Sequence, residues 1–303
     1  MKNKLPNFLI VGAAKSGTTS LYHYLKEHPE IYLHKKKEIR FFSQMKGNFR
    51  GPRDKNVNKS IVKNIEEYKT YFINLQKEIA IGDISPDYLF FYENAVSGIK
   101  KYLINPKIII ILRNPIERAF SQWVYFVKDG REFLSFEDAL FEEEKRKSLN
   151  WEWAWYYKEV GLYYNQVKAY LENFDNVKIY LYDDLQKDRL GLVQDIYRFL
   201  EVNDNFVPES LNEKYNVSGI PKNKFLHKFL REENLIKDII KPVVKTVLPD
   251  KVRHKLINKI MQKNLQKPQM KPETREYLKN YYKEDILKLQ DLINRDLTHW
   301  LKD

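Results

Sequence analysis

Short apolar runs alternate along the chain with longer segments in which apolar residues recur at helical spacing. The runs that predict buried strands are Phe8–Gly12, Ile79–Gly82, Lys107–Leu112 and Val177–Tyr182. Such alternation is typical of a parallel sheet with helices on both faces. The run from Ile108 to Leu112 lacks any polar alternation, so we expect it to be a strand in the middle of the sheet, buried on both sides.

Helical spacing combined with start and stop signals predicts four helices between these strands. They are Thr18–Glu27, Pro115–Val127, Phe136–Lys147 and Leu162–Phe174. Asn114 and Pro115 are typical of a helix start, and His28-Pro29 of a helix end. The pattern therefore predicts an α/β fold with a P-loop-like three-layer α/β/α arrangement around a central parallel sheet.

Two further segments differ from this alternating pattern. From about Lys224 the chain is almost wholly helical and rich in lysine, broken by Pro242, Pro249, Pro268 and Pro272. Lys46–Lys63, with its Gly, Pro, Asn and Lys residues, is expected to be a long surface loop. We expect one domain over residues 1–303, with an α/β core over 1–218 and a basic helical C-terminal region over 219–303.

The composition points to anionic partners. The 303 residues include 53 Lys+Arg and 41 Asp+Glu, which gives a formal net charge of +12. The chain has no cysteine, so disulfides, thiolate nucleophiles and cysteine-bound zinc are excluded. The six histidines show no metal-ligand spacing, and no Ser/His/Asp pattern favours a hydrolase.

No apolar run is long enough to predict a membrane-spanning helix, which needs about 20 residues. The N-terminal run after Lys2 and Lys4 could imitate a secretory signal, but it is short and Pro6 and Asn7 interrupt its approach. It is better interpreted as the first buried strand. The Lys, Asn and Ile content and the absence of a predicted anchor favour a bacterial cytoplasmic enzyme.

The first predicted strand leads into a turn of small and polar residues and then a helix. The turn and helix start contain Lys15, Ser16, Gly17, Thr18, Thr19 and Ser20. Unpaired N–H groups at a helix start bind anions, Gly17 allows close approach, and Lys15 adds a full charge. A Walker A loop has its lysine after the second glycine, whereas Lys15 precedes Gly17. A tight turn with a solvated lysine is the alternative.

A second anion site is predicted after the strand Lys107–Leu112. In P-loop kinases and NTPases an acidic residue ends the corresponding strand and helps to hold Mg²⁺. Here the strand is followed by Arg113, and Ser121 lies about two turns along the next helix. Both predicted sites lie at the carboxyl edge of the sheet, where ligands bind open α/β sheets. Two such sites without a metal indicate a doubly phosphorylated ligand.

These two motifs resemble those of the sulfotransferases that use 3′-phosphoadenosine 5′-phosphosulfate (PAPS), particularly the branch related to heparan sulfate sulfotransferases. Lys15–Ser20 is similar to the family's 5′-phosphosulfate loop. Arg113-Asn114-Pro115, with Arg118 and Ser121, is similar to its 3′-phosphate element. The resemblance implies PAPS as donor, 3′,5′-bisphosphoadenosine (PAP) as product, and Lys15 as the residue that stabilises the leaving group.

The resemblance extends to Lys37-Glu38-Ile39-Arg40-Phe41-Phe42, where it implies that Glu38 is the general base. The alternative is a surface carboxylate paired with Lys35, Lys36, Lys37 or Arg40. Two positions depart from the heparan branch. Ile84 occupies a place where a lysine is common, and Arg40 stands where some relatives have histidine. Both departures argue against a heparan-like acceptor.

Two other features leave alternatives open. The aromatic cluster comprises Trp151, Trp153, Trp155, Tyr156 and Tyr157, and these side chains pack in the core or line an acceptor cleft. Lys222-Asn223-Lys224 resembles a basic loop that closes over the nucleotide phosphates in relatives, so Lys222 is a further candidate. A solvated basic turn explains it nearly as well.

The sequence thus predicts an enzyme that moves a sulfuryl group from PAPS to a hydroxyl or amine of a carbohydrate or small molecule. Neither a metal nor nucleic acid is expected to take part. The alternatives are a metal-dependent P-loop kinase or NTPase, against which Arg113 argues, and a noncatalytic protein that binds anionic polymers, which the net charge favours.

Overall fold

Five parallel strands form the central sheet of the computed structural model, which describes residues 5–73, 75–213, 219–223 and 264–302. The strand order is β2-β3-β1-β4-β5. Their bounds are β1 (Phe8–Gly12), β2 (Ile31–Leu33), β3 (Ala80–Ile84), β4 (Lys107–Leu112) and β5 (Val177–Leu181). All four predicted strands are confirmed. The unpredicted β2 has three residues, too few for a visible period.

β4 is an interior strand, as its apolar run predicts, although β1 occupies the centre of the sheet. Every residue from Ile108 to Leu112 is fully buried. β4 pairs with β1 on one side and with β5 on the other. The carboxyl ends of β1 and β4 therefore lie next to each other at one edge.

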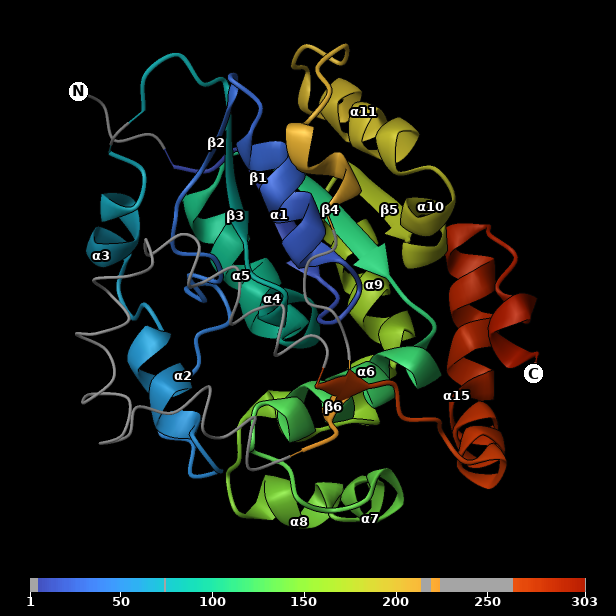
Figure 1. Cartoon of the computed structure of the whole chain (residues 1–303). Coiled ribbons are helices and arrows are strands. Elements are labelled where there is room, and N and C mark those ends of the chain that lie inside the picture. Colours follow the sequence, from blue (N-terminus) through green and yellow to red (C-terminus); the bar gives the residue numbers. More distant parts are fainter. Residues whose placement is uncertain (1–4, 74, 214–218, 224–263, 303) are drawn as a thin grey trace, which may run out of the picture.

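Helices cover both faces of the sheet, which confirms the three-layer α/β fold (Figure 1). Up to β5 they are α1 (Thr18–Lys26), α2 (Asp54–Ser60), α3 (Ile65–Thr70), α4 (Asp87–Phe90), α5 (Tyr92–Tyr102), α6 (Pro115–Lys128), α7 (Phe136–Phe141), α8 (Glu143–Ser148) and α9 (Tyr163–Asn173), with the short 3₁₀ helices η1 (Trp153–Trp155) and η2 (Glu159–Gly161). After β5 come α10 (Tyr182–Lys187), α11 (Arg189–Leu200), η3 (Glu209–Asn212), α15 (Pro272–Ile293) and η4 (Thr298–Leu301).

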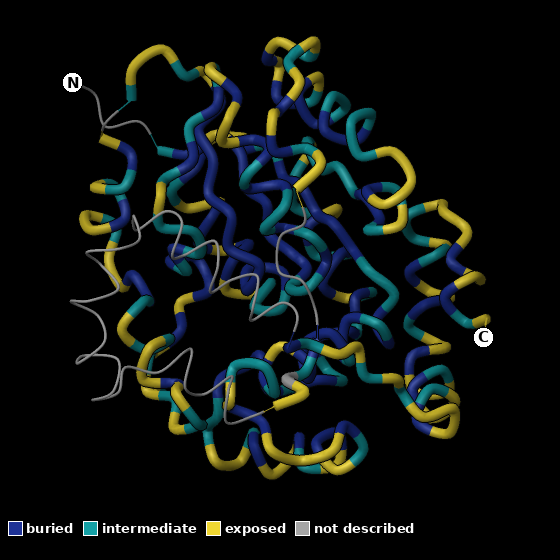
Figure 2. Tube along the Cα trace, in the orientation of Figure 1, coloured by how far each residue is buried: buried dark blue, intermediate teal, exposed yellow. Residues whose placement is uncertain are grey.

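Alternate residues of β1 belong to two separate cores, because side chains alternate across a strand. Phe8 and Ile10 pack in a cluster with α1, α10 and α11. Leu9 and Val11 pack in a larger cluster with α5, α6, α9 and α15. The strands run through the most continuously buried part of the molecule (Figure 2).

Two local predictions are wrong. The single helix expected over Phe136–Lys147 is divided into α7 and α8, and the buried Glu143 carboxylate at their junction accepts hydrogen bonds from the amides of Lys158 and Glu159. The surface loop expected over Lys46–Lys63 contains α2, which starts at the fully buried Asp54. In both places a buried carboxylate makes tertiary contacts that local composition does not show.

The C-terminal region is helical where the structure describes it. α15 buries Leu278, Tyr282, Ile286 and Leu289 in the same core as α9. The predicted helices over 224–263 lie outside the described residues. β6 (Ile220–Pro221) and β7 (Leu265–Gln266) form a small antiparallel pair. The shared core favours one domain, and the boundary between 218 and 219 stays a prediction.

None of the described helices is both long enough and apolar enough to cross a membrane.

Candidate active site

A cavity of about 610 Å³ opens at the carboxyl edge of the sheet. Its walls come from the β1–α1 turn, the segment after β2, α2, the start and inner face of α6, and η1. Within the described part of the chain, six cationic side chains line it, namely Lys15, Lys37, Arg40, Arg53, Arg113 and Arg131, against the three carboxylates Glu38, Asp129 and Glu152. The excess of positive charge suits an anionic ligand.

The β1–α1 turn forms one wall. Gly17 precedes α1 in the left-handed region with φ of 97°, a conformation that glycine adopts without steric cost. Gly17 has no side chain that could cap the first turn of α1, so the amide groups there remain available to a ligand in the cavity. Predicted residues of this turn that line the cavity are Lys15, Gly17, Thr18, Thr19 and Ser20.

Ser16 differs from its neighbours in the turn. It is fully buried and is not among the residues that line the cavity. Its amide donates to the carbonyl of Ala13 at 3.3 Å, which closes the turn. The structure therefore places Ser16 behind the turn, and its contact with a ligand stays a prediction.

Lys15 faces the aromatic ring of Tyr125, with Nζ 4.3 Å from the ring centre. Burial, reinforced by the positive charge of Arg113, lowers the pKa of Lys15 from 10.5 to about 8. A nearby anion stabilises such a buried ammonium group more strongly than it stabilises a solvated lysine, because the buried group has already lost much of its hydration.

Arg113 follows β4 and reaches across to the first turn. Its Nη1 donates to the backbone carbonyl of Lys15 at 3.2 Å, and its guanidinium lies 4.9 Å from the ring centre of Tyr182. Asn114 caps α6 by accepting from the amide of Ile116 at 3.0 Å. Arg113 and Ser121 both line the cavity, and their contact with a phosphate stays a prediction.

Arg118, the fourth residue of α6, lies in the interior. It is 1% exposed and donates to the carbonyl of Tyr157. It is not among the cavity-lining residues, so its role in the structure is to support the segment after η1.

Glu38 lies in the segment between β2 and α2 and reaches the cavity beside the β1–α1 turn. Its carboxylate accepts from Arg40 Nη2 at 2.6 Å and from Lys37 Nζ at 3.4 Å. The same Nζ donates to Thr19 Oγ1 at 3.0 Å, so Lys37 links Glu38 to the turn. Burial opposes ionisation, but the charges of Lys37 and Arg40 outweigh it and lower the pKa of Glu38 to about 2.

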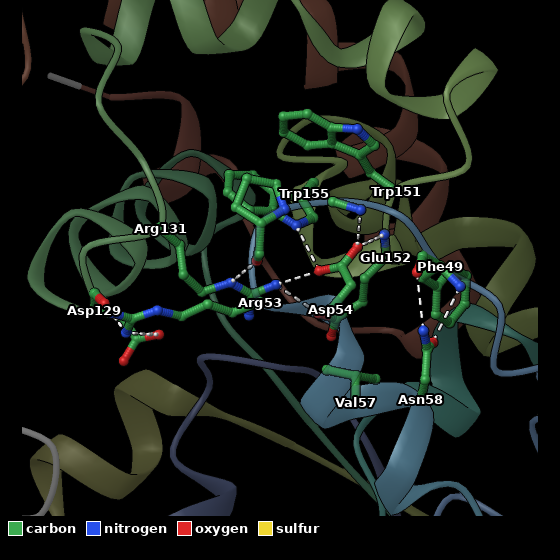
Figure 3. A network of polar contacts seen from close by, with 12 residues as sticks. Phe49, Arg53, Asp54, Val57, Asn58, Asp129, Arg131, Trp151, Glu152 and Trp155 are labelled. Atoms are coloured by element: carbon green, nitrogen blue, oxygen red, sulfur yellow. Dashed lines mark hydrogen bonds and ion pairs between the residues drawn. The ribbon is translucent and has the colours of Figure 1, made fainter.

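The far end of the cavity was not predicted. The residues that line it are Arg53, Asn56, Val57, Asp129, Arg131 and Glu152. Arg53 donates to the backbone carbonyl of Asp129 at 2.6 Å (Figure 3). These residues come from three distant segments without any motif, so only the folded chain brings them together.

A buried ion-pair network supports this end (Figure 3). Arg131 Nη2 lies 2.6 Å from Asp54 Oδ1 and 2.9 Å from Glu152 Oε2. Asp54 also accepts from the amides of Gly51 and Glu152, each at 2.8 Å, and from the indole N–H of Trp155 at 3.2 Å. The network fixes α2 to η1 and so fixes the shape of the cavity.

The aromatic cluster serves mainly as core. Trp155 and Tyr157 are fully buried and Trp153 is 5% exposed. Trp153 is also the one aromatic residue of the cluster that lines the cavity within the described part of the chain. Packing in the core is therefore confirmed for Trp153, Trp155 and Tyr157, and the contact of Trp153 with an acceptor stays a prediction.

Two other predicted positions lie away from the cavity. Lys222 is exposed beside the β6–β7 pair and is absent from the cavity lining, so its contact with nucleotide phosphates stays a prediction. Ile84 is 3% exposed in the core that contains α1. It therefore brings no charge to the site.

Among the described residues, no group of three or more His, Asp or Glu side chains is placed to hold a metal ion.

A model of the sulfotransferase family matches residues 6–205. The crystal structure of a sulfotransferase from Alicyclobacillus acidocaldarius superimposes with a TM-score of 0.77 at 33% identity, covering 98% of this chain and 99% of that one. The protein therefore belongs to the sulfotransferase family.

Curated relatives match over shorter stretches. The membrane-associated sulfotransferase kil1 of Dictyostelium discoideum is 35% identical over 127 residues, which are 41% of this chain and 24% of the relative. Human carbohydrate sulfotransferase 15 is 27% identical over 172 residues, which are 46% of this chain and 30% of the relative. The matched region thus spans less than a third of either relative.

Proposed function

We propose that the protein transfers a sulfuryl group from PAPS to a hydroxyl or amine of a carbohydrate or small-molecule acceptor. One observation supports the proposal most. Lys15, Arg113, the uncapped start of α1 and the ionised Glu38 all line the same cavity. The similarity to human carbohydrate sulfotransferase 15 supports a carbohydrate as the acceptor. A cytoplasmic location stays a prediction.

The residues present fit a nucleotide with two phosphate groups. The amides at the start of α1 and Lys15 would hold the 5′ end, and Arg113 with Ser121 would hold the 3′-phosphate. Bound PAPS supplies the sulfuryl group. The cations supply the charge neutralisation that Mg²⁺ provides in phosphoryl transfer, so we propose a reaction without a metal.

In the transfer, Lys15 stabilises the negative charge that develops on the bridging oxygen of the departing PAP. Loss of one such positioned donor typically lowers the rate by about 10²–10³. Glu38 accepts the proton of the attacking acceptor, a role that contributes about 10²–10⁴. An anion at the start of α1 attracts Lys37 away from Glu38, which raises the basicity of the carboxylate, since Lys37 contacts both Glu38 and Thr19.

A kinase or NTPase is disfavoured because β4 is followed by Arg113 and not by an acidic residue. Thermal unfolding distinguishes the two functions. PAP without metal should raise the melting temperature of the wild-type protein well beyond the effect of ATP with Mg²⁺. Equal or reversed shifts would contradict the proposal.

Acceptor transfer needs a separate assay. Wild-type protein with ³⁵S-labelled PAPS should label at least one member of a panel of neutral sugars, amino sugars, uronate-containing oligosaccharides and phenols. Glu38→Gln should abolish labelling and leave the PAP-induced thermal shift nearly intact. Full activity of Glu38→Gln on the best acceptor would refute the assignment of the base.

A further inference from the structure

The backbone turn that carries Glu38 has an unfavourable local conformation. Glu38 and Arg40 both have left-handed backbone angles, with φ of 64° and 63°. Residues other than glycine are strained in this region, and such a conformation persists only where the surrounding structure imposes it. Something outside the turn must therefore hold Glu38 in the cavity.

Three contacts from the end of β3 and from α4 hold this turn. The amide of Glu38 donates to the carbonyl of Ile84 at 3.0 Å. The amide of Arg40 donates to Ser85 Oγ at 3.2 Å, and the amide of Phe41 donates to the Tyr88 hydroxyl at 3.0 Å. Two of the three acceptors are side-chain hydroxyls.

Both hydroxyls meet at the buried Asp83, which is 1% exposed. Ser85 Oγ donates to Asp83 Oδ1 at 2.8 Å, and the Tyr88 hydroxyl donates to Oδ2 at 2.7 Å. A backbone amide can only donate, so each hydroxyl accepts from an amide of the turn and directs its own hydrogen to Asp83. Asp83 thereby sets the direction of both contacts.

We propose that Asp83, Ser85 and Tyr88 are positioning residues that hold the Glu38 turn in its reactive geometry. This inference rests on the proposed role of Glu38 as the base. None of the three side chains is among those that line the cavity, so they act through the backbone and not on a substrate. Misplacement of a reacting group by about 1 Å can lower a rate about 100-fold.

Tyr68 provides a matched control. Its hydroxyl donates to the same Asp83 Oδ2 at 3.0 Å, and it is fully buried like Tyr88. Among the hydrogen bonds of the described residues, it makes none to the Glu38 turn. Tyr68→Phe and Tyr88→Phe each remove one buried hydroxyl from Asp83 and keep the ring, but only Tyr88→Phe also removes an acceptor for the amide of Phe41.

The test compares Ser85→Ala, Tyr88→Phe and Tyr68→Phe in the full chain, with the best acceptor of the panel and PAPS as substrates. Ser85→Ala and Tyr88→Phe should lower kcat at least about tenfold, with unchanged KM for PAPS and an unchanged PAP-induced thermal shift. Tyr68→Phe should keep kcat within about twofold of wild type. The proposal would be overturned if kcat fell equally in Tyr68→Phe and Tyr88→Phe. It would also be overturned if kcat stayed unchanged in both Ser85→Ala and Tyr88→Phe.

Amide exchange tests the same contacts without an acceptor. Hydrogen–deuterium exchange of residues 38–42 should accelerate in Ser85→Ala and Tyr88→Phe and stay at the wild-type rate in Tyr68→Phe. Unchanged exchange in all three variants would overturn the positioning role. A wild-type protein that labels no acceptor would instead contradict the proposed function, so the two failures are distinguishable.

Discussion

Arg40 Nη2 lies 2.6 Å from Glu38 Oε2, so the carboxylate proposed as the base is already paired with a permanent cation. Because Arg40 cannot release a proton near neutral pH, this pairing keeps Glu38 ionised at every physiological pH. The charge of Lys37 and this pairing with Arg40 together make Glu38 a weaker base, with a pKa of about 2. Arg40 therefore helps to set how readily Glu38 accepts a proton.

The first prediction concerns the pH dependence of turnover. Replacing Arg40 by alanine removes a stabilising charge, while burial still disfavours the ionised carboxylate, so the pKa of Glu38 should rise from about 2 towards or above its ordinary 4.5. Turnover should then fall as the pH is lowered into this range, where Glu38 becomes protonated. The measurement is kcat against pH, with Arg40→Lys as the control that keeps the charge. Superimposable profiles for Arg40→Ala and Arg40→Lys would contradict the prediction.

The second prediction concerns protons taken up with the nucleotide. The pKa of Lys15 is about 8 without ligand, and a bound phosphate should raise it. PAP binding above pH 8 should therefore consume a proton and weaken as the pH rises. Calorimetric titration in two buffers with different ionisation enthalpies measures the uptake. The Lys15→Met protein should bind PAP without taking up the proton that Lys15 takes up in the wild type. A proton uptake equal to that of the wild type would disprove the assignment of this proton to Lys15.

The third prediction concerns the anion-binding turn. A Cβ at Gly17 would lie 2.8 Å from Leu185 in a backbone with φ of 97°, so Gly17→Ala should distort the turn and weaken PAP binding. Gly47→Ala is the control, because Gly47 has φ of 70° and is not among the cavity-lining residues. Both variants should lose about 1–2 kcal/mol of stability. Only Gly17→Ala should lose affinity in a PAP titration.

The fourth prediction concerns the ion-pair network below the far end of the cavity. Arg131→Met leaves Asp54 and Glu152 buried without their cation, which should lower the free energy of unfolding by about 3–5 kcal/mol. Lys69→Met breaks the exposed pair with Glu66 and should cost at most about 1 kcal/mol. Urea unfolding measures both. A smaller loss for Arg131→Met than for Lys69→Met would show that the network does not stabilise the fold.

The sequence determined the parts of the site that lie at the ends of regular elements. The apolar run of β4 predicts its burial, and the turn before Thr18 predicts the start of α1, because burial and helix starts leave local patterns. Lys15 and Arg113 follow adjacent strands, so a parallel sheet brings them to one edge. The hydrogen bond from Arg113 to the Lys15 carbonyl follows from this arrangement.

Only the tertiary structure decided the surroundings of these residues. Asp54 lies in a stretch whose composition predicts a loop, yet it is buried because Arg131, 77 residues away in the chain, neutralises it. The turn of Glu38 donates hydrogen bonds to the hydroxyls of Ser85 and Tyr88, and both hydroxyls donate to the buried Asp83. Hydrogen bonds and ion pairs between distant segments depend on the approach of side chains in space, and no local period of the sequence records that approach.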